Sequence, residues 1–176
     1  TMNILGLSYY YHDSAAALLQ DGMLTAAAEE ERFSRQKHDS GFPHNAIEFC
    51  LKQAGLEGRD LDYVVFYEKP LVKLDRIFKT CLSNFPRSYA VFREAMLSWT
   101  NQKLWIKSGL AQYLKLSPDK VLFVEHHIAH AASAFFCSPF EKAALLTVDG
   151  VGEWTTAAMG QGTANWFGNN VNQIQL

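Results

Sequence analysis

The residues with the clearest potential for chemistry are the three histidines of the segment EHHIAH, residues 125–130. His126 and His130 are four positions apart, so in a helix their imidazoles lie one turn apart on the same face. Two imidazoles at that spacing can hold one divalent ion without any change in the backbone. The segment lacks the glutamate of an HExxH motif, so a zinc protease is excluded. The alternative interpretation is an ordinary polar helix start, and the residues alone leave it open.

A further candidate ligand is Asp149, which ends an apolar stretch and precedes Gly150-Val151-Gly152. A carboxylate at a strand end, next to a glycine-rich turn with exposed backbone N–H groups, can ligate a metal or lie beside a phosphate. Asp-Gly is also common in plain hairpin turns. Together with the two histidines, this aspartate would complete a ligand set that suits Fe(II), Mn(II) or Zn(II).

Two polar segments near the N-terminus could also carry chemistry. Tyr9-Tyr10-Tyr11 is too bulky for a simple hairpin and would suit the wall of a ligand site, while His12 and Asp13 could orient a hydroxyl or act as a general base. A capped hairpin turn is the alternative.

The second polar segment is EEERFSRQKHDSGFP, residues 29–43, which we interpret as a long functional loop. Arg32, Arg35 and Lys37 in this loop could hold a phosphate or a carboxylate. Charged runs are more often solvated surfaces, and that interpretation also stays open.

The composition excludes several classes of protein. The chain has 176 residues, is 48% hydrophobic and carries 16 Lys and Arg against 18 Asp and Glu, so it can form a core and has no basic excess for binding nucleic acid or a membrane surface. No apolar run is long enough for a transmembrane helix, and no secretory signal is expected. Cys50, Cys81 and Cys137 are too few and too scattered for a disulfide framework. We therefore expect reduced thiols and a cytoplasmic location.

The elements that would position these residues alternate between strands and helices. Asp21-Gly22 lies between two apolar runs and predicts a hairpin. The predicted strands are 3–8, 14–19, 23–28, 62–67, 120–124, 143–148 and 153–159. The predicted helices are 45–54, two or three within 71–116 that break near Pro86 and Gly109, and 125–136; no helix is expected in 160–176.

This order predicts an α/β fold. Three antiparallel strands followed by strand–helix units describe one lobe of a ribonuclease-H-like fold of the actin and Hsp70 type, with a mixed sheet. We assign residues 2–142 to that lobe. Residues 143–176 begin the same pattern again, as the truncated start of a second lobe. A complete domain with a loose tail is the alternative.

Four motifs, in order, resemble the N-terminal part of the carbamoyltransferase family, which includes nodulation-factor and antibiotic O-carbamoyltransferases. They are LGLSYYYHDSAAALLQDG, AAAEEERFSRQKHDSGFP, VEHHIAHAASAFF and LLTVDGVGEW, and they span residues 5–154. The resemblance implies a two-lobed transfer domain followed by a separate C-terminal domain. That second domain would make carbamoyl-adenylate from carbamoyl phosphate and ATP. The first would then pass the carbamoyl group to a hydroxyl of a small molecule such as a sugar or an antibiotic.

The resemblance also implies roles for individual residues. His126 and His130 match two ligands of a divalent metal, most often Fe(II), and Asp149 matches a third, with a fourth ligand beyond Leu176. His12 matches a position near the acceptor hydroxyl. Lys37 matches a position that contacts the nucleotide or the carbamoyl donor. Asp13, His38 and His127 lie in the motifs without an assigned role, and the fragment alone is expected to be inactive.

Two other functions compete with this one. A relative of the tRNA threonylcarbamoyl-transfer proteins would share the paired histidines but would not carry the 29–43 loop. A kinase-like nucleotide-binding module would need a phosphate-binding turn and no metal histidines. The expected partners are a nucleotide and a small hydroxyl acceptor, with no nucleic acid and no membrane. The acceptor and the oligomeric state cannot be inferred from the sequence.

Overall fold

The computed structural model describes residues 1–101, 103–150, 154–164 and 173–176. It divides into two compact units. The first comprises Thr1–Tyr67 with Tyr89–Phe123, and the second comprises Glu68–Ser88 with Val124–Leu176. The boundary expected between residues 142 and 143 therefore falls inside the second unit.

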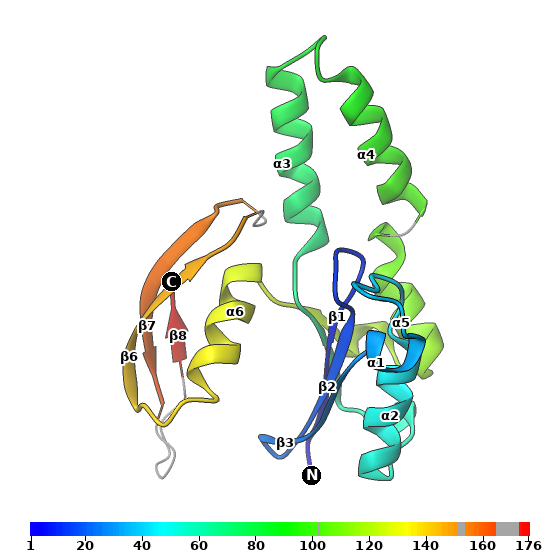
Figure 1. Ribbon diagram of the computed structural model, residues 1–176, viewed down its shortest axis with the longest axis vertical. Coiled ribbons are helices and arrows are strands. Elements are labelled where there is room, and N and C mark those ends of the chain that lie inside the picture. The colour runs from blue at the N-terminus through cyan, green and yellow to red at the C-terminus, as the bar shows by residue number, and fades with distance from the viewer. Residues whose placement is uncertain (102, 151–153, 165–172) are drawn as a thin grey trace. The chain divides into compact units, whose positions relative to one another are not determined.

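The first unit is built on a five-stranded mixed sheet with the order β3-β2-β1-β4-β5 (Figure 1). The strands are β1 (Asn3–Ser8), β2 (Ala15–Gln20), β3 (Met23–Glu29), β4 (Tyr63–Phe66) and β5 (Val121–Phe123). The first three pair antiparallel, β4 then pairs parallel with β1, and β5 pairs parallel with β4. This is the strand order of a ribonuclease-H-like lobe, and it confirms the predicted fold class.

The turn chemistry of the β2–β3 hairpin explains why two alanine-rich segments form strands. Asp21 and Gly22 connect them with positive φ angles of 50° and 82°. Two consecutive residues at positive φ suit the right-handed twist of a two-residue hairpin, and Asp-Gly is a favoured pair there. The register places Leu19 opposite Leu24, with a bulge between Leu18 and Leu19.

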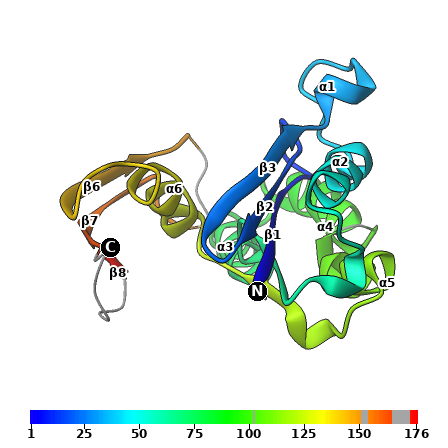
Figure 2. The same ribbon diagram turned by 90° about the horizontal axis from the view of Figure 1, so that it is seen from below.

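Helices cover one face of this sheet, as Figure 2 shows for α2 (His44–Ala54) and α5 (Ile106–Leu114). Residues of β1 alternate between buried and half-buried positions, as a strand with one covered face requires. The unit also contains α1 (Glu31–Ser34), α4 (Tyr89–Asn101) and three 3-10 turns, η1 (Gly58–Asp60), η2 (Lys103–Trp105) and η3 (Pro118–Lys120).

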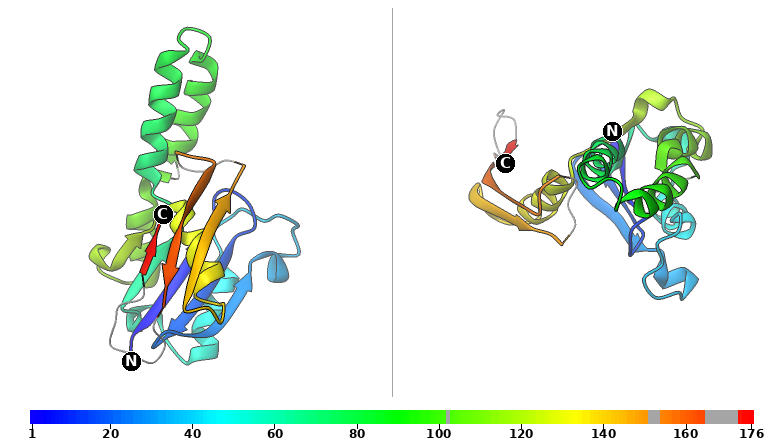
Figure 3. Two further views of the ribbon diagram at one scale, coloured as in Figure 1. Left: turned by 90° about the vertical axis from the view of Figure 1, so that its left-hand side faces the viewer. Right: turned by 90° about the horizontal axis from the view of Figure 1, so that it is seen from above.

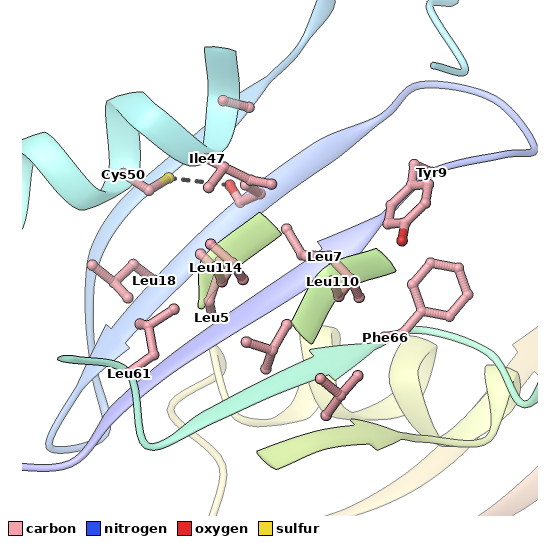
Figure 4. Close-up of a cluster of buried hydrophobic side chains, with 14 of the residues drawn as sticks. Leu5, Leu7, Tyr9, Leu18, Ile47, Cys50, Leu61, Phe66, Leu110 and Leu114 are labelled. Carbon is pink, nitrogen blue, oxygen red and sulfur yellow. Dashed lines mark hydrogen bonds between the residues drawn. The ribbon is translucent and has the colours of Figure 1, made fainter. Parts of the chain in front are cut away.

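The core of the first unit lies between the sheet and these helices (Figure 4). Leu5 and Leu7 of β1 belong to the same buried cluster as Ile47 of α2 and Leu110 of α5. Cys50 is fully buried in this cluster and its burial raises the pKa of the thiol. All three cysteines are free thiols, as expected.

The second unit contains a three-stranded antiparallel sheet with α6 (His126–Phe135) packed against it, and also α3 (Pro70–Ser83). Its strands are β6 (Lys142–Val148), β7 (Ala157–Thr163) and β8 (Gln173–Gln175), side by side in that order (Figure 3). Phe135 packs against Leu145 and Ala164 in the core. A Cβ at Gly162 would come within 2.8 Å of the Phe135 ring, so glycine permits this close packing.

The structure corrects three details of the predicted elements. Gly109 lies inside α5, and the helical break falls instead at η2; an isolated glycine costs a helix only about 1 kcal/mol. The strand predicted at 153–159 is Ala157–Thr163, and residue 153 lies outside the described residues. The 29–43 loop contains the short helix α1. None of the described helices combines the length and apolarity needed to cross a bilayer.

Candidate functional site

Two imidazoles and a carboxylate meet in the second unit. The Nε2 atoms of His126 and His130 are 3.1 Å apart, and His126 Nε2 is 2.7 Å from Asp149 Oδ2. The candidate ligand atoms of all three residues lie within 4.8 Å of one another. The helical spacing of the histidines and the strand-end position of Asp149 thus bring them together, and we call this set the C-terminal triad.

Hydrogen bonds of His127 hold the elements that carry the C-terminal triad together. It is buried, its Nδ1 lies 2.8 Å from the Thr147 hydroxyl, and its Nε2 lies 2.8 Å from the Thr155 carbonyl. A neutral imidazole satisfies both contacts when Nε2–H donates to the carbonyl and Nδ1 accepts from the hydroxyl. The Asp149 N–H donates to the Thr156 carbonyl at 2.8 Å. These bonds tie α6, the end of β6 and the segment before β7 together, so the position of Asp149 is defined.

The electrostatics of the C-terminal triad favour a neutral His130 and an ionised Asp149 carboxylate. Burial and the neighbouring His126 lower the pKa of His130 below its ordinary value. Burial opposes ionisation of Asp149, but the hydrogen bond and the charge of His126 outweigh it, and the pKa of that carboxyl is lowered. These are the protonation states that a metal ion requires of its ligands. A pocket of about 240 Å³, lined by residues of α6 and β6, lies beside His130 and leaves room next to the triad.

A second cluster, which we call the N-terminal triad, lies in the first unit. Asp13 bridges two histidines: Oδ2 lies 2.8 Å from His12 Nδ1, and Oδ1 lies 2.9 Å from His38 Nδ1. Each Nδ1–H can therefore donate to the carboxylate, which leaves the two Nε2 atoms as the acceptors of neutral imidazoles. Hydrogen bonds from His38 and from His12 lower the pKa of Asp13.

The N-terminal triad depends on two loops that are tied together by backbone bonds. The Ser14 N–H donates to the Asp39 carbonyl at 2.7 Å, and the Tyr10 N–H donates to the Ser40 carbonyl at 2.9 Å. Asp13 and His38 have φ angles of 46° and 56°, in the left-handed region that residues with a Cβ rarely adopt. Such strain persists only where surrounding contacts enforce it, and it concentrates at functional sites.

The basic residues of the 29–43 loop differ in their surroundings. Arg32 pairs with Glu29 at 3.0 Å and with Glu31 at 3.6 Å. Lys37 is exposed and makes no hydrogen bond or ion pair with any of the described residues. Lys37 directly precedes His38, so its ammonium group is available to an anion near the N-terminal triad.

Glu30 has a structural role in this loop. It is buried, and its carboxylate accepts hydrogen bonds from the backbone N–H groups of Asn45 at 3.2 Å and Ala46 at 2.8 Å. These groups belong to the first turn of α2, whose N–H groups lack partners within the helix. A carboxylate at that end also interacts favourably with the helix dipole. Part of the charged run is therefore a helix cap and not a solvated surface.

The comparisons with known proteins agree with these motifs. The family described as carbamoyltransferase N-terminus matches residues 3–171, almost the whole chain. The chain belongs to this carbamoyltransferase family.

Two curated relatives extend this result. The chain is 49% identical to the uncharacterized protein sll1178 of Synechocystis over 170 residues, which covers 93% of this chain and 28% of the relative. It is 34% identical to the nodulation protein NolNO of Sinorhizobium fredii over 138 residues, covering 76% of this chain and 19% of the relative. This carbamoyltransferase-family chain thus spans less than a third of the length of either relative.

The fold of this family member is also found in a solved structure. An uncharacterized protein with similarity to the peptidase YeaZ from Pseudomonas aeruginosa matches with a TM-score of 0.50 and 15% identity. The match covers 99% of this chain and 64% of that chain. At this identity the likeness shows the fold alone.

Sequence reasoning missed three contacts in this carbamoyltransferase-family chain: the Asp13 bridge and the Glu30 cap in the first unit, and the His127 anchor in the second. The bridge had a signal, because the tripeptide His-Asp-Ser occurs in both loops, at residues 12–14 and 38–40. The cap had a weaker signal, a run of glutamates about fifteen residues before a helix that has no side-chain cap of its own at Pro43. Nothing in the sequence distinguishes the anchoring His127 from the two candidate ligands beside it.

Proposed function

We propose that this chain is the N-terminal part of the transfer domain of an O-carbamoyltransferase that acts in the cytoplasm. The parent protein would make carbamoyl-adenylate from carbamoyl phosphate and ATP in a further domain and pass the carbamoyl group to a hydroxyl of a small molecule. The observation that carries this proposal is the convergence of His126, His130 and Asp149 in a chain of the carbamoyltransferase family. The match to a nodulation protein supports a small-molecule acceptor.

The C-terminal triad fits a divalent transition metal. Two imidazole nitrogens and one carboxylate oxygen are the donors that Fe(II), Mn(II) and Zn(II) accept, and three protein ligands leave coordination positions open. His126, His130 and Asp149 would hold the ion, and we favour Fe(II). When bound, such an ion supplies charge neutralisation for the donor's phosphate and polarisation of the carbamoyl carbonyl.

His12 is the general base of the proposed reaction. Its Nδ1 is engaged by Asp13, so Nε2 can take the proton of the acceptor hydroxyl. The acceptor oxygen then forms a bond to the carbamoyl carbon, the bond from that carbon to the phosphate oxygen breaks, and AMP leaves. The Asp13 carboxylate stabilises the imidazolium that forms. Asp13 is a positioning residue, because it acts through His12.

Lys37 is the anion-binding residue of the proposed site. Its charge has no protein partner among the described residues, so it is free to contact the phosphate of the carbamoyl donor. An ammonium group at that point would stabilise the negative charge that grows on the leaving AMP.

The test uses the full-length parent protein with ATP, carbamoyl phosphate, Fe(II) and a panel of sugars and aminoglycosides. Mass spectrometry follows carbamoyl-adenylate and carbamoylated product. His126→Ala is expected to abolish product formation while carbamoyl-adenylate still forms and accumulates. His12→Ala and Lys37→Ala are each expected to slow transfer by about 100-fold or more. Product formation at the wild-type rate in His126→Ala would overturn the role of the C-terminal triad, and absence of carbamoyl-adenylate in the wild type would overturn the proposed donor.

A further inference from the structure

The first unit contains an aromatic pocket that the proposed function does not use. Its volume is about 280 Å³. The walls come from the end of β1, the segment before α2, and α5 with the turn that precedes it. The lining residues are Tyr9, Tyr10, Phe42, His44, Trp105, Ile106, Gly109, Leu110 and Tyr113. Small-molecule sites have this character, with mostly apolar and aromatic walls and few polar groups.

Tyr9 supplies the observation that points to a ligand. Its side chain is 98% buried, since only 2% of the residue is exposed, and it lines the pocket. The ring packs edge-on against Phe42 at 5.2 Å and Phe66 at 5.0 Å between centroids, at the end of the core cluster in Figure 4. Its hydroxyl makes no hydrogen bond with any described residue. The hydroxyl is not among the described polar atoms that are fully enclosed without a partner, so it stays accessible from the pocket that Tyr9 lines. It is therefore available as a donor to an acceptor that the pocket admits.

Gly109 is a second and independent observation. It lies inside α5, where glycine is less favourable than alanine by about 1 kcal/mol. A Cβ at this position would meet no atom within 4 Å, so no neighbouring group in the described structure requires the glycine. Its effect is to leave the pocket open on the side of α5.

The lining determines which chemical class the pocket can take. No lysine, arginine, aspartate or glutamate lines it, so neither sign of charge would find a salt-bridge partner there. The hydroxyl of Tyr113 is already engaged by His44 Nδ1 at 2.9 Å. Burial, and to a smaller extent Glu48 and Glu30, raise the pKa of Tyr113, as surroundings that disfavour an anion would. The Tyr9 hydroxyl is a nearly buried donor in this lining that makes no hydrogen bond with a described residue.

We propose that the aromatic pocket binds an uncharged ring compound, or an uncharged ring of a larger ligand, that carries a hydrogen-bond acceptor for the Tyr9 hydroxyl. The ring stacks among the aromatic walls, and the acceptor oxygen or nitrogen completes the bond that the protein leaves unmade. This binding requires neither ATP nor carbamoyl phosphate.

Benzamide is the probe, because it combines a planar ring with an uncharged carbonyl acceptor. Saturation-transfer NMR with the full-length protein, in the absence of nucleotide, measures its affinity. Tyr9→Phe removes only the donor and is expected to weaken benzamide three- to tenfold, as one neutral hydrogen bond would. The same variant is expected to be at least as stable as the wild type towards urea. Benzoate has the same shape and a negative charge, and it is expected to bind at least tenfold more weakly than benzamide.

Two leucine substitutions on α5 form a matched pair. Gly109→Leu places a side chain where the pocket is open and is expected to abolish the benzamide signal. Ser108→Leu adds the same side chain at an exposed neighbouring position that does not line the pocket, and it is expected to leave the affinity unchanged. Failure of the folded wild type to bind benzamide, or equal binding by Gly109→Leu, overturns the proposal. Because neither measurement involves carbamoyl transfer, such a failure would leave the proposed function intact.

Discussion

The N-terminal and C-terminal triads have the same composition, two histidines and one aspartate, and opposite connectivity. In the first, the carboxylate is central and holds both imidazoles by Nδ1. In the second, an imidazole is central, and His126 Nε2 faces both the other histidine and the carboxylate. The first arrangement leaves the two Nε2 atoms without a bond to the carboxylate. The second gathers three donor atoms around one position. In the proposed function, this difference in arrangement, and not residue type, assigns proton transfer to the N-terminal triad and metal binding to the C-terminal triad.

The two triads also differ in how far their histidine side chains are exposed to solvent. The side chains of His12 and His38 are 61% and 65% exposed, whereas that of His126, the central residue of the C-terminal triad, is 10% exposed and only His130 of that triad is exposed. Solvent weakens interactions between charges, so the N-terminal triad depends on direct hydrogen bonds within strained loops. The C-terminal triad lies on a helix and a strand end that His127 ties together. A preorganised set of donors suits a bound ion, and accessible nitrogen atoms suit a substrate that comes and goes.

The largest expected effect tests whether only one triad binds metal. In the full-length protein, His130→Ala is expected to lower the affinity for Fe(II) or Zn(II) by more than about 100-fold, because it removes a ligand and not merely an outer partner. His38→Ala serves as the matched control and is expected to retain the metal. Metal content after dialysis, by inductively coupled plasma mass spectrometry, measures both. Loss of metal in His38→Ala would show that the two triads do not divide the chemistry in this way.

The next effect concerns the rate of transfer. Asp13→Asn is expected to lower kcat by about 100-fold or more, because the amide cannot hold both imidazoles or stabilise His12 once it is protonated. Metal content and carbamoyl-adenylate formation should not change. Asp39→Asn is the control, since its amide oxygen can still accept from the Gly41 N–H. A wild-type rate in Asp13→Asn would remove this carboxylate from the mechanism.

The next prediction concerns stability, has an effect of intermediate size, and tests whether the two triads are independent. Glu30→Ala leaves the N–H groups of Asn45 and Ala46 without their acceptor and is expected to lower the free energy of unfolding by about 2 kcal/mol. Glu29→Ala removes only an exposed ion pair with Arg32 and should change the free energy of unfolding by less than about 0.5 kcal/mol. Urea unfolding measures both. Glu30→Ala should still bind metal when folded, and metal loss in the folded variant would contradict the independence of the triads.

The smallest effect is on the titration of Asp13. Its pKa lies below the ordinary value of 3.8, with His38 the larger contributor and His12 the smaller. Since the folded state holds this carboxyl ionised more readily than the unfolded state does, its contribution to stability is present above pH 3.8 and is lost as the pH falls through the lowered pKa. Replacement of His38 with alanine should bring the pKa of Asp13 closer to 3.8 than replacement of His12 with alanine does. Carboxyl NMR titration measures which of the two substitutions raises the pKa of Asp13 more. A larger rise in the His12 variant would contradict the bridge geometry.

Most elements of the first unit were predictable because their signals are local. The β2–β3 hairpin follows from the two apolar runs on either side of Asp21-Gly22, and the end of α2 follows from Gly55, whose φ is 66°. The C-terminal triad was predictable in outline for a related reason. A helix fixes the spacing of His126 and His130, and a strand end fixes the place of Asp149. The shift of β7 was not predictable, because a strand in a polar, glycine-containing segment is defined by the partner with which it pairs.

The sequence by itself determined most of the strands and helices and the types of group available for chemistry, because periodicity and turn preference act over a few residues. The tertiary structure alone decided which carboxylate serves which purpose. Glu30 caps α2, fifteen residues further along the chain. Asp13 meets a histidine 25 positions away, and the Tyr9 hydroxyl, at the wall of a pocket, has no hydrogen-bond partner among the described residues. A hydrogen bond requires two atoms to approach within about 3 Å. Between residues distant in sequence, that approach is set by the packing of the loops and helices that carry them.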